Sequence, residues 1–452
     1  MTSDLNTNPS PATVAVAPHR LLRWARSRFS TPVIVFWVAA VIGLLTGVAA
    51  FLLKWTIGTV STFFMSRLHV GTFNYALLLI PVAGIMLTGI FQRYILRHDI
   101  THGVARIIDC IDRRRYNLPP YMIWAYTVAS TLTLGFGGSA GSEGPIATTC
   151  AAIGSNIGRW LGLDQRHIMV MLAVGAGAGI AGIFKAPIGG ALFTVEVLHP
   201  AVSTLSVISL LVACLVSAST AYVLSGCTVD LSYIQVDPLG LEMTPYVLLL
   251  GVACGLYSVY YRTIMRAMTR FYESVRNPWL RNFIGGAVLA VCVFCFPVLY
   301  GEGYPMMESL LNGQMPSLVD YGGWLRDWRD PATVIWLCLG VTACKAFATS
   351  GANCSGGVAG DFAPTLFAGC FFGMLVGHLL NLATGLDLPV STMAFIGMGG
   401  VMAGVIRAPL MAIFLTLEMT NGYALFLPVM VVCALSSGVV KVLADFSFFR
   451  RK

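Results

Sequence analysis

The sequence predicts an all-α polytopic membrane protein, and three observations lead to this prediction. Of 452 residues, 57% are hydrophobic and only 11% are charged, whereas soluble domains have about 25% charged residues. The hydrophobic residues form many separate segments, several of them shorter than the ~20 residues of a spanning helix. Gly and Pro interrupt many segments, as in the discontinuous helices of transporters. A soluble enzyme, a disordered chain and a nucleic-acid-binding domain are poor interpretations of this composition.

The chain begins with a polar, basic tail at residues 1–31 and ends with the basic residues 450–452. Basic residues beside membrane segments stay on the cytoplasmic side. We therefore expect both termini in the cytoplasm, beneath a bacterial-type inner membrane. Between them, apolar segments lie near 32–53, 74–91, 121–136, 146–160, 167–198, 203–225, 245–261, 282–299, 333–348, 363–382, 390–403, 408–419 and 422–443.

An internal repeat divides the membrane region into two halves. Residues 177–197 and 399–419 share an Ala-Gly…Ala-Pro pattern, and each has a glutamate nine residues after its proline. A Gly-rich turn that ends in proline precedes each copy at a similar distance. We therefore expect one membrane repeat at 32–225 and a second at 245–449, joined by a linker at 226–244.

The charges in the loops indicate that the two repeats are inverted. The linker before the second repeat contains Asp230, Asp237 and Glu242 but no Lys or Arg, and an arginine cluster at 262–281 follows that repeat's first segment. The linker is therefore expected on the extracytoplasmic side. Inverted repeats place a substrate site near the middle of the bilayer, between the halves.

Glu143 is the most informative single residue. It is the only charged side chain between Arg115 and Arg159. A carboxylate at membrane depth costs about 2.5–3.5 kcal/mol on insertion scales and marks a functional candidate. It stands just before Pro145 at an expected helix start, where free N–H groups and the helix dipole attract an anion. The carboxylate can occupy the anion site until it is protonated; a plain helix cap is the alternative role.

Other polar residues in apolar surroundings have helix-end roles as their simplest interpretation. Asp361 precedes a proline at the second Gly-rich turn, where an N-cap explains it. Glu196 and Glu418 stand at the ends of apolar helices. His98 and His102 are four residues apart without a third ligand, so no metal site is predicted. The sequence contains no phosphate loop and no catalytic constellation, so we expect neither a cofactor nor enzyme activity.

Five motifs together resemble the CLC family of chloride channels and proton-coupled chloride transporters. The resemblance extends over roughly 32–449 and is closest to the bacterial type without cytoplasmic regulatory domains. It implies an inverted repeat of tilted, discontinuous helices, a homodimer and one anion pathway in each subunit. The motifs are GSEGP at 141–145, FKAPIGGALFTVEV at 184–197, GEGYP at 301–305, SGGVAGDFAPTLFAG at 355–369 and APLMAIFLTLEMTNGY at 408–423.

The resemblance also implies which residues form the anion pathway. Glu143 falls on the family's gating glutamate, and Ser142 replaces an arginine that the family usually has there. The implied anion-binding residues are His102, Gly103, Gly141, Ser142, Gly144, Phe362, Ala363 and Phe449.

Besides Ser142, three positions on or beside this pathway differ from the family pattern. His102 replaces a serine, and a ring N–H can donate to an anion in its place. Phe449 replaces a tyrosine and lacks its hydroxyl donor. Asp361 replaces an apolar residue, next to the apparent extra residues Ala359 and Gly360. An acid at that position repels chloride unless it is protonated or turned away.

The function predicted from these residues is chloride transport through a pathway gated by a glutamate. The family's inner proton-transfer glutamate aligns with Val197, so a proton path would run through Glu143 and Glu196. This difference favours a passive channel over tight proton coupling. A proton-coupled chloride antiporter and a fluoride-selective member stay open as alternatives, and a cation transporter is a remote one.

The expected partners follow from the same interpretation. They are chloride or another small anion, protons in the coupled alternative, the lipid bilayer and a second copy of the chain. Apolar faces at 203–225 and 422–443 are candidates for the interface between copies. No nucleic acid is expected.

Overall fold

The computed structural model describes residues 28, 31–66, 76–100, 103–200, 203–228, 231, 240–313 and 331–449. In these ranges, nine helices are long and apolar enough to span a membrane. The predicted all-α, multi-pass architecture is therefore confirmed. Most of the tail 1–31, most of the linker 226–244 and the end 450–452 lie outside the described residues.

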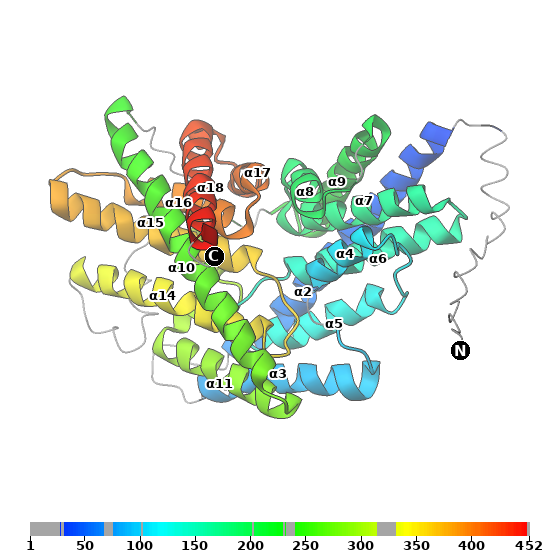
Figure 1. Cartoon of the computed structure of the whole chain (residues 1–452), viewed down its shortest axis with the longest axis horizontal. Coiled ribbons are helices and arrows are strands. Elements are labelled where there is room, and N and C mark those ends of the chain that lie inside the picture. Colours follow the sequence, from blue (N-terminus) through cyan, green and yellow to red (C-terminus); the bar gives the residue numbers. More distant parts are fainter. Residues whose placement is uncertain are drawn as a thin grey trace, which may run out of the picture.

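The two halves of the chain lie side by side (Figure 1). The first half contains α2 (Thr31–Met65), α3 (Ala76–Ile90) with η1 (Phe91–Leu96), α4 (Gly103–Asp112), α5 (Met122–Gly135), α6 (Glu143–Trp160), α7 (Gln165–Phe184), α8 (Pro187–Phe193) with η2 (Thr194–Leu198), and α9 (Thr204–Leu224). The second half contains η3 (Leu241–Met243), α10 (Thr244–Ser274), α11 (Pro278–Cys295), η4 (Pro297–Leu299), α12 (Tyr304–Leu311), α14 (Pro331–Asn353), α15 (Phe362–Thr384), α16 (Val390–Ile406), α17 (Pro409–Thr420), η6 (Tyr423–Leu425) and α18 (Phe426–Phe449).

A tight break separates two helices at the same place in each half. Within the apolar segment 167–198, Lys185 has a left-handed φ of 56° and ends α7. Arg407 has a φ of 65° and ends α16 in the same way. Each break is followed by a helix that begins with proline, α8 and α17 respectively, because proline suits the first turn of a helix.

Glycines let the central helices approach closely. The pairs α6–α7 and α15–α16 follow the two Gly-rich turns and pack tightly in their own halves. A Cβ atom on Gly175 of α7 would lie 2.2 Å from the carbonyl oxygen of Cys150, and one on Gly397 of α16 would lie 2.5 Å from that of Gly369. Small residues at such contacts are typical of packed membrane helices.

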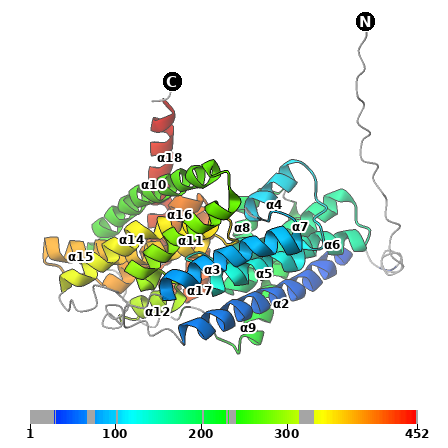
Figure 2. The same cartoon turned by 90° about the horizontal axis from the view of Figure 1, so that it is seen from below.

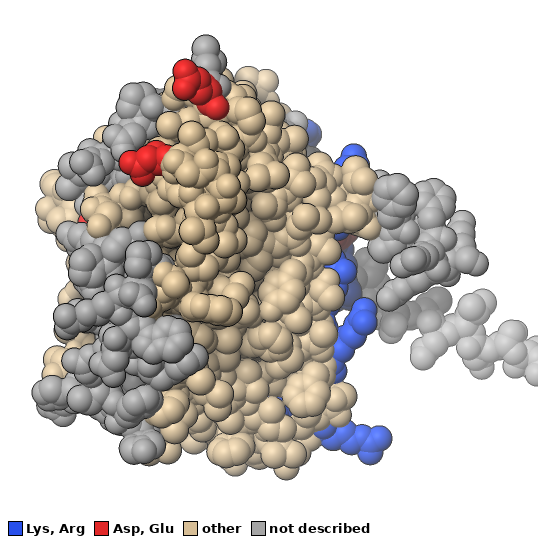
Figure 3. Space-filling view, turned by 90° about the vertical axis from the view of Figure 1, so that its left-hand side faces the viewer, with Lys and Arg blue, Asp and Glu red and all other residues tan. Residues whose placement is uncertain are grey.

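The surface charges indicate how the molecule sits in a bilayer. One face has a broad area without Lys, Arg, Asp or Glu side chains, between an edge with Lys and Arg and a region with Asp and Glu (Figure 3). Seen from another side, α18 extends beyond the other helices at its C-terminal end (Figure 2). A charge-free belt of this kind fits the hydrocarbon layer, with the basic edge on one side of it.

Substituting Gly175 tests the packing. Gly175→Ala is expected to lower the free energy of unfolding by about 1–3 kcal/mol, because the added methyl group must displace the backbone of α6. Gly58→Ala in α2 is the control, since a Cβ there meets nothing within 4 Å and alanine is the better helix former. Unfolding of the purified variants in detergent measures both effects. An equal loss in both variants would contradict the packing argument.

Candidate functional site

The side chain of Glu143 lies where the two halves of the protein meet. Glu143 is the first residue of α6 and is 1% exposed. Its Oε1 atom accepts a hydrogen bond of 2.7 Å from the backbone N–H of Ala363, in the first turn of α15. Helix starts carry free N–H groups and the positive end of the helix dipole. One carboxylate therefore lies between two helix starts, one from each repeat.

Two glycines leave the space that this carboxylate fills. A Cβ atom on Gly141 would lie 2.0 Å from Oε2 of Glu143, and one on Gly360 would lie 2.7 Å from the same atom. The two glycines are also joined, because each donates its N–H to the other's carbonyl, at 2.9 and 2.6 Å. Within the described residues, Oε2 is buried without a hydrogen-bond partner. The cradle thus holds the carboxylate closely but leaves one oxygen unpaired.

A third helix start, that of α4, lies against the same place. A Cβ atom on Gly103, the first residue of α4, would lie 3.2 Å from the carbonyl oxygen of Gly144. Gly103 and Gly144 are therefore neighbours, as the predicted pathway requires. His102 and the side chain of Phe449 lie outside the described residues, so their roles stay predictions.

Two of the predicted anion-binding residues use their donors within the protein. The N–H and the hydroxyl of Ser142 both donate to Oε1 of Glu302, at 2.9 and 2.6 Å, and the N–H of Gly141 pairs with Gly360. Because other acceptors occupy these donors, binding of an anion by Ser142 and Gly141 requires these hydrogen bonds to break, and their anion-binding role stays a prediction.

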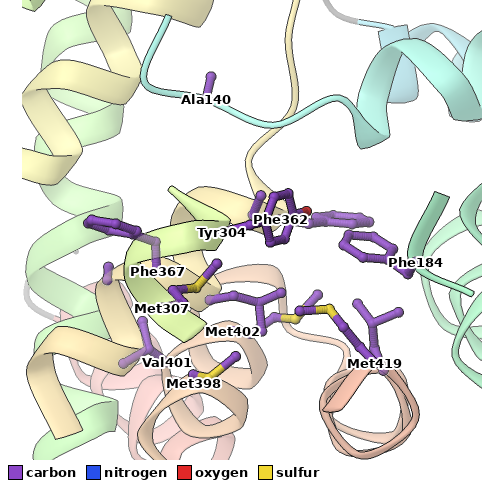
Figure 4. Packing of buried hydrophobic residues seen from close by; sticks show 14 of the residues in the cluster. Ala140, Phe184, Tyr304, Met307, Phe362, Phe367, Met398, Val401, Met402 and Met419 are labelled. Atoms are coloured by element: carbon purple, nitrogen blue, oxygen red, sulfur yellow. The ribbon is translucent and has the colours of Figure 1, made fainter. Parts of the chain in front are cut away.

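Phe362 and Ala363 do lie at the start of α15 beside Glu143. The ring of Phe362 packs edge-on against that of Phe193 at the end of α8, with 5.6 Å between the centroids. Figure 4 shows Phe362 among buried hydrophobic residues that include Tyr304. The apolar wall excludes water around the helix start, and exclusion of water strengthens the attraction between its N–H groups and an anion.

Asp361 stands at the N-cap position of α15 but does not cap the helix through its side chain. Its Oδ1 atom instead accepts a hydrogen bond of 2.9 Å from the Asn353 side chain. It also lines a cavity of about 360 Å³ together with Arg266 and Arg270. The plain N-cap predicted for Asp361 is thus wrong, because the Asn353 side chain, and not an N–H of α15, donates to its carboxylate.

Sequence reasoning missed two charged residues of the site, Lys345 and Glu302. Lys345 of α14 is fully buried, and its Nζ atom donates to the Ser139 hydroxyl at 2.9 Å. Nζ also lies 4.2 Å from the centroid of the Phe367 ring. The ammonium group interacts electrostatically with Glu143 and with Glu302. A buried cation therefore accompanies the two carboxylates.

The sequence does contain a signal for Lys345. It is the only charged residue between Asp330 and Asp361, which is the criterion that singled out Glu143. Glu302 has a weaker signal. It belongs to the GEGYP motif, but an acid in a loop between apolar segments is common and does not by itself indicate a functional site.

Glu196 and Glu418 make reciprocal caps between the halves. Each carboxylate accepts two backbone N–H groups from the first turn of a helix in the other repeat. The donors are Leu410 and Met411 of α17 for Glu196, at 3.2 and 2.7 Å, and Ile188 and Gly189 of α8 for Glu418, at 3.0 and 2.7 Å. The helix-end bonds predicted for both glutamates are present, and both oxygens of Glu196 are engaged in them.

Comparison with known proteins identifies the family. The family model for the voltage gated chloride channel matches residues 84–441. The chain belongs to this family, the CLC family. A protein of Ralstonia nicotianae named putative chloride channel protein ClcB-like is 32% identical over 372 residues, which cover 79% of this chain and 81% of that protein. The resemblance inferred from the five motifs is confirmed.

Solved structures share the fold of this CLC protein. A slow cyanobacterial Cl⁻/H⁺ antiporter superposes with a TM-score of 0.76 at 24% identity, covering 90% of this chain and 94% of that one. A CLC-type fluoride/proton antiporter superposes with a TM-score of 0.73 at 22% identity, covering 90% and 95%. The likeness confirms the CLC-like fold.

A double-mutant cycle tests the link between Lys345 and Glu143. Lys345→Met is expected to destabilise the protein, because it leaves buried carboxylates without the nearby cation. Adding Glu143→Gln should recover part of the loss, with a coupling energy of about 0.5–3 kcal/mol. Denaturation in detergent at one pH measures the cycle. Lys441→Met on the exposed face of α18 is the control, and strict additivity of the Lys345 and Glu143 substitutions would contradict the link.

Proposed function

We propose that this CLC protein transports chloride across the membrane, without enzyme activity, and that Glu143 gates its pathway. The observation that carries the proposal is the hydrogen bond from the Ala363 N–H to the Glu143 carboxylate, between helix starts of opposite repeats. The carboxylate stands in for a bound anion. The naming of the Ralstonia nicotianae relative as a putative chloride channel protein supports chloride as the anion.

The mechanism follows from competition for one positively polarised place. While Glu143 is ionised, its carboxylate occupies the N–H group of Ala363, and a chloride ion would be repelled. Protonation removes that charge, and the neutral side chain can leave the cradle formed by Gly141 and Gly360. Chloride then takes the place between the helix starts, where the buried ammonium of Lys345 also attracts it. Transport should therefore increase as the pH falls.

Passive conduction is the form of transport that we propose. The position of the family's inner proton-transfer glutamate is Val197, and both oxygens of the neighbouring Glu196 accept helix-end hydrogen bonds. The alternative is proton-coupled antiport, which the structural neighbours described as antiporters favour. A reversal potential that shifts with a proton gradient indicates antiport, and a fixed one indicates a channel.

The selectivity among anions is proposed as chloride before fluoride. One structural neighbour is a fluoride/proton antiporter, and Ser142 and Asp361 depart from the usual family residues. Efflux from liposomes loaded with either anion, followed with chloride and fluoride electrodes, separates the two selectivities.

We also propose a homodimer in the bacterial inner membrane. Exposed apolar side chains on α9 and α18, including Leu215 at 58% and Leu427 at 64% exposure, supply a face for a second copy. Light scattering of the purified protein in detergent gives the number of copies directly.

Substituting Glu143 tests the gate. Wild-type chloride flux into liposomes is expected to rise as the pH is lowered. Glu143→Gln and Glu143→Ala should both give flux that no longer depends on pH, because neither side chain carries a charge that protonation removes. Glu418→Gln is the control, since that glutamate lies outside the site, and it should keep the wild-type pH response. An unaltered pH response in both Glu143 variants would overturn the gating role.

Labelling of Cys227 tests the orientation. It is the only exposed cysteine among the twelve and lies at the start of the predicted extracytoplasmic linker. In intact cells, a membrane-impermeant maleimide should label the wild-type protein but not Cys227→Ser. Labelling that requires permeabilised cells would place the linker, and with it both repeats, in the opposite orientation.

A further inference from the structure

A row of arginines lies along one face of α10. Arg262, Arg266 and Arg270 are four residues apart, so their side chains project from the same face of the helix. The helix has 31 residues and is about 46 Å long at 1.5 Å per residue, well beyond the ~30 Å hydrocarbon core. The helix packs against α18, whose C-terminal end extends beyond the other helices (Figure 2).

A fourth arginine completes a cavity on this side. Arg407, at the left-handed end of α16, joins the three arginines of α10 around a cavity of about 470 Å³. We call it the four-arginine cavity. The remaining lining is uncharged and includes the apolar side chains of Val259, Val440, Leu443 and Ala444.

The four guanidinium groups form no salt bridge with an acid of the described residues. Like charges four residues apart on a helix repel one another, and Arg262 also interacts unfavourably with Arg266 and Arg407. The Nη1 atom of Arg262 is buried and donates no hydrogen bond in the described part of the chain. A folded protein that keeps four such cations together, one with a buried free donor, has a site suited to a multivalent anion.

We propose that the four-arginine cavity binds a ligand with two or more phosphate groups. The planar guanidinium fork matches the oxygens of a phosphate group in pairs. A single chloride ion cannot neutralise four cations or use their paired donors. The apolar part of the lining suits the acyl end of an anionic lipid, whereas a free polyphosphate uses the arginines alone. Phosphate is the chemistry that both sources share.

The position of the cavity connects the ligand to transport. Arg266 and Arg270 also line the smaller cavity of about 360 Å³ beside Asp361. Asp361 is two residues from Ala363, whose N–H holds Glu143. A bound phosphate ligand therefore lies on the approach to the anion site and should reduce chloride flux. This effect on flux rests on the proposed function, whereas binding of the ligand does not.

Binding of pyrophosphate to the full-length protein tests the proposal. The protein is placed in nanodiscs of zwitterionic phosphatidylcholine, and calorimetry measures binding at constant ionic strength. Arg266→Gln/Arg270→Gln should weaken binding at least tenfold. The control is Arg115→Gln/Arg276→Gln, which removes the same charge from exposed positions outside the cavity and should bind like the wild type.

A second arm distinguishes the two phosphate sources. Nanodiscs that contain cardiolipin should weaken pyrophosphate binding if the lipid headgroup occupies the cavity, and native mass spectrometry should then detect cardiolipin on the wild type but not on Arg266→Gln/Arg270→Gln. Unchanged pyrophosphate binding in cardiolipin nanodiscs identifies free phosphate as the ligand class.

Further variants keep the outcome decisive. If the glutamine pair does not fold, Arg266→Lys/Arg270→Lys keeps the charges, loses the guanidinium forks and should weaken binding severalfold. The proposal is overturned if neither pyrophosphate nor cardiolipin binds the wild type, or if the cavity variants and the control pair bind equally well. A cavity variant that no longer binds pyrophosphate but still transports chloride shows that the ligand site and the transport function are tested independently.

Discussion

The structure depends on the hydrogen bond between the Ala363 N–H and the Glu143 carboxylate. A helix start buried in a membrane protein has N–H groups that water cannot reach, so a hydrogen-bond acceptor of the protein or a bound anion must lie against them. Here two such starts, α6 and α15, face one another across the junction of the repeats. The carboxylate of Glu143, the first residue of α6, accepts an N–H of α15 while the pathway is closed. The same unsatisfied donors create the place for a mobile anion, so stability of the helix starts and transport rest on one interaction.

The pseudo-symmetry of the chain appears again away from this site. Glu196 caps α17, and Glu418 caps α8, so each repeat satisfies a helix start of the other. Such paired caps hold the short helices α8 and α17 against one another. Glu143 is the exception to this pattern. Its Oε1 atom accepts a hydrogen bond from only one N–H of the opposite repeat, and its Oε2 atom has no partner in the described residues. The structural glutamates are therefore saturated, whereas the proposed gate is held loosely enough to leave.

The sequence was sufficient for features that depend on composition and order along the chain. The membrane class followed from the scarcity of charge, and Glu143 from its isolation. The break at Lys185 was not predicted, because the apolar run continues through it and only a left-handed backbone reveals the turn. The orientation of Asp361 was equally hidden, since it depends on Asn353. Lys345 was available from the sequence, by the same isolation criterion that selected Glu143.

The charges around Glu143 explain why protonation, rather than a simple movement, is the natural trigger. Glu143, half-buried Glu302 and fully buried Lys345 interact electrostatically. With both acids ionised, the cluster has two negative charges beside a single lysine. A chloride ion brought into such a cluster meets a net negative charge in surroundings of low polarity, where repulsion is strong. One proton on Glu143 removes one negative charge from the cluster and frees the Ala363 N–H at the same time. Because Glu302 is tied to both donors of Ser142, Glu143 is the acid whose protonation releases no structural bond other than the one that chloride replaces.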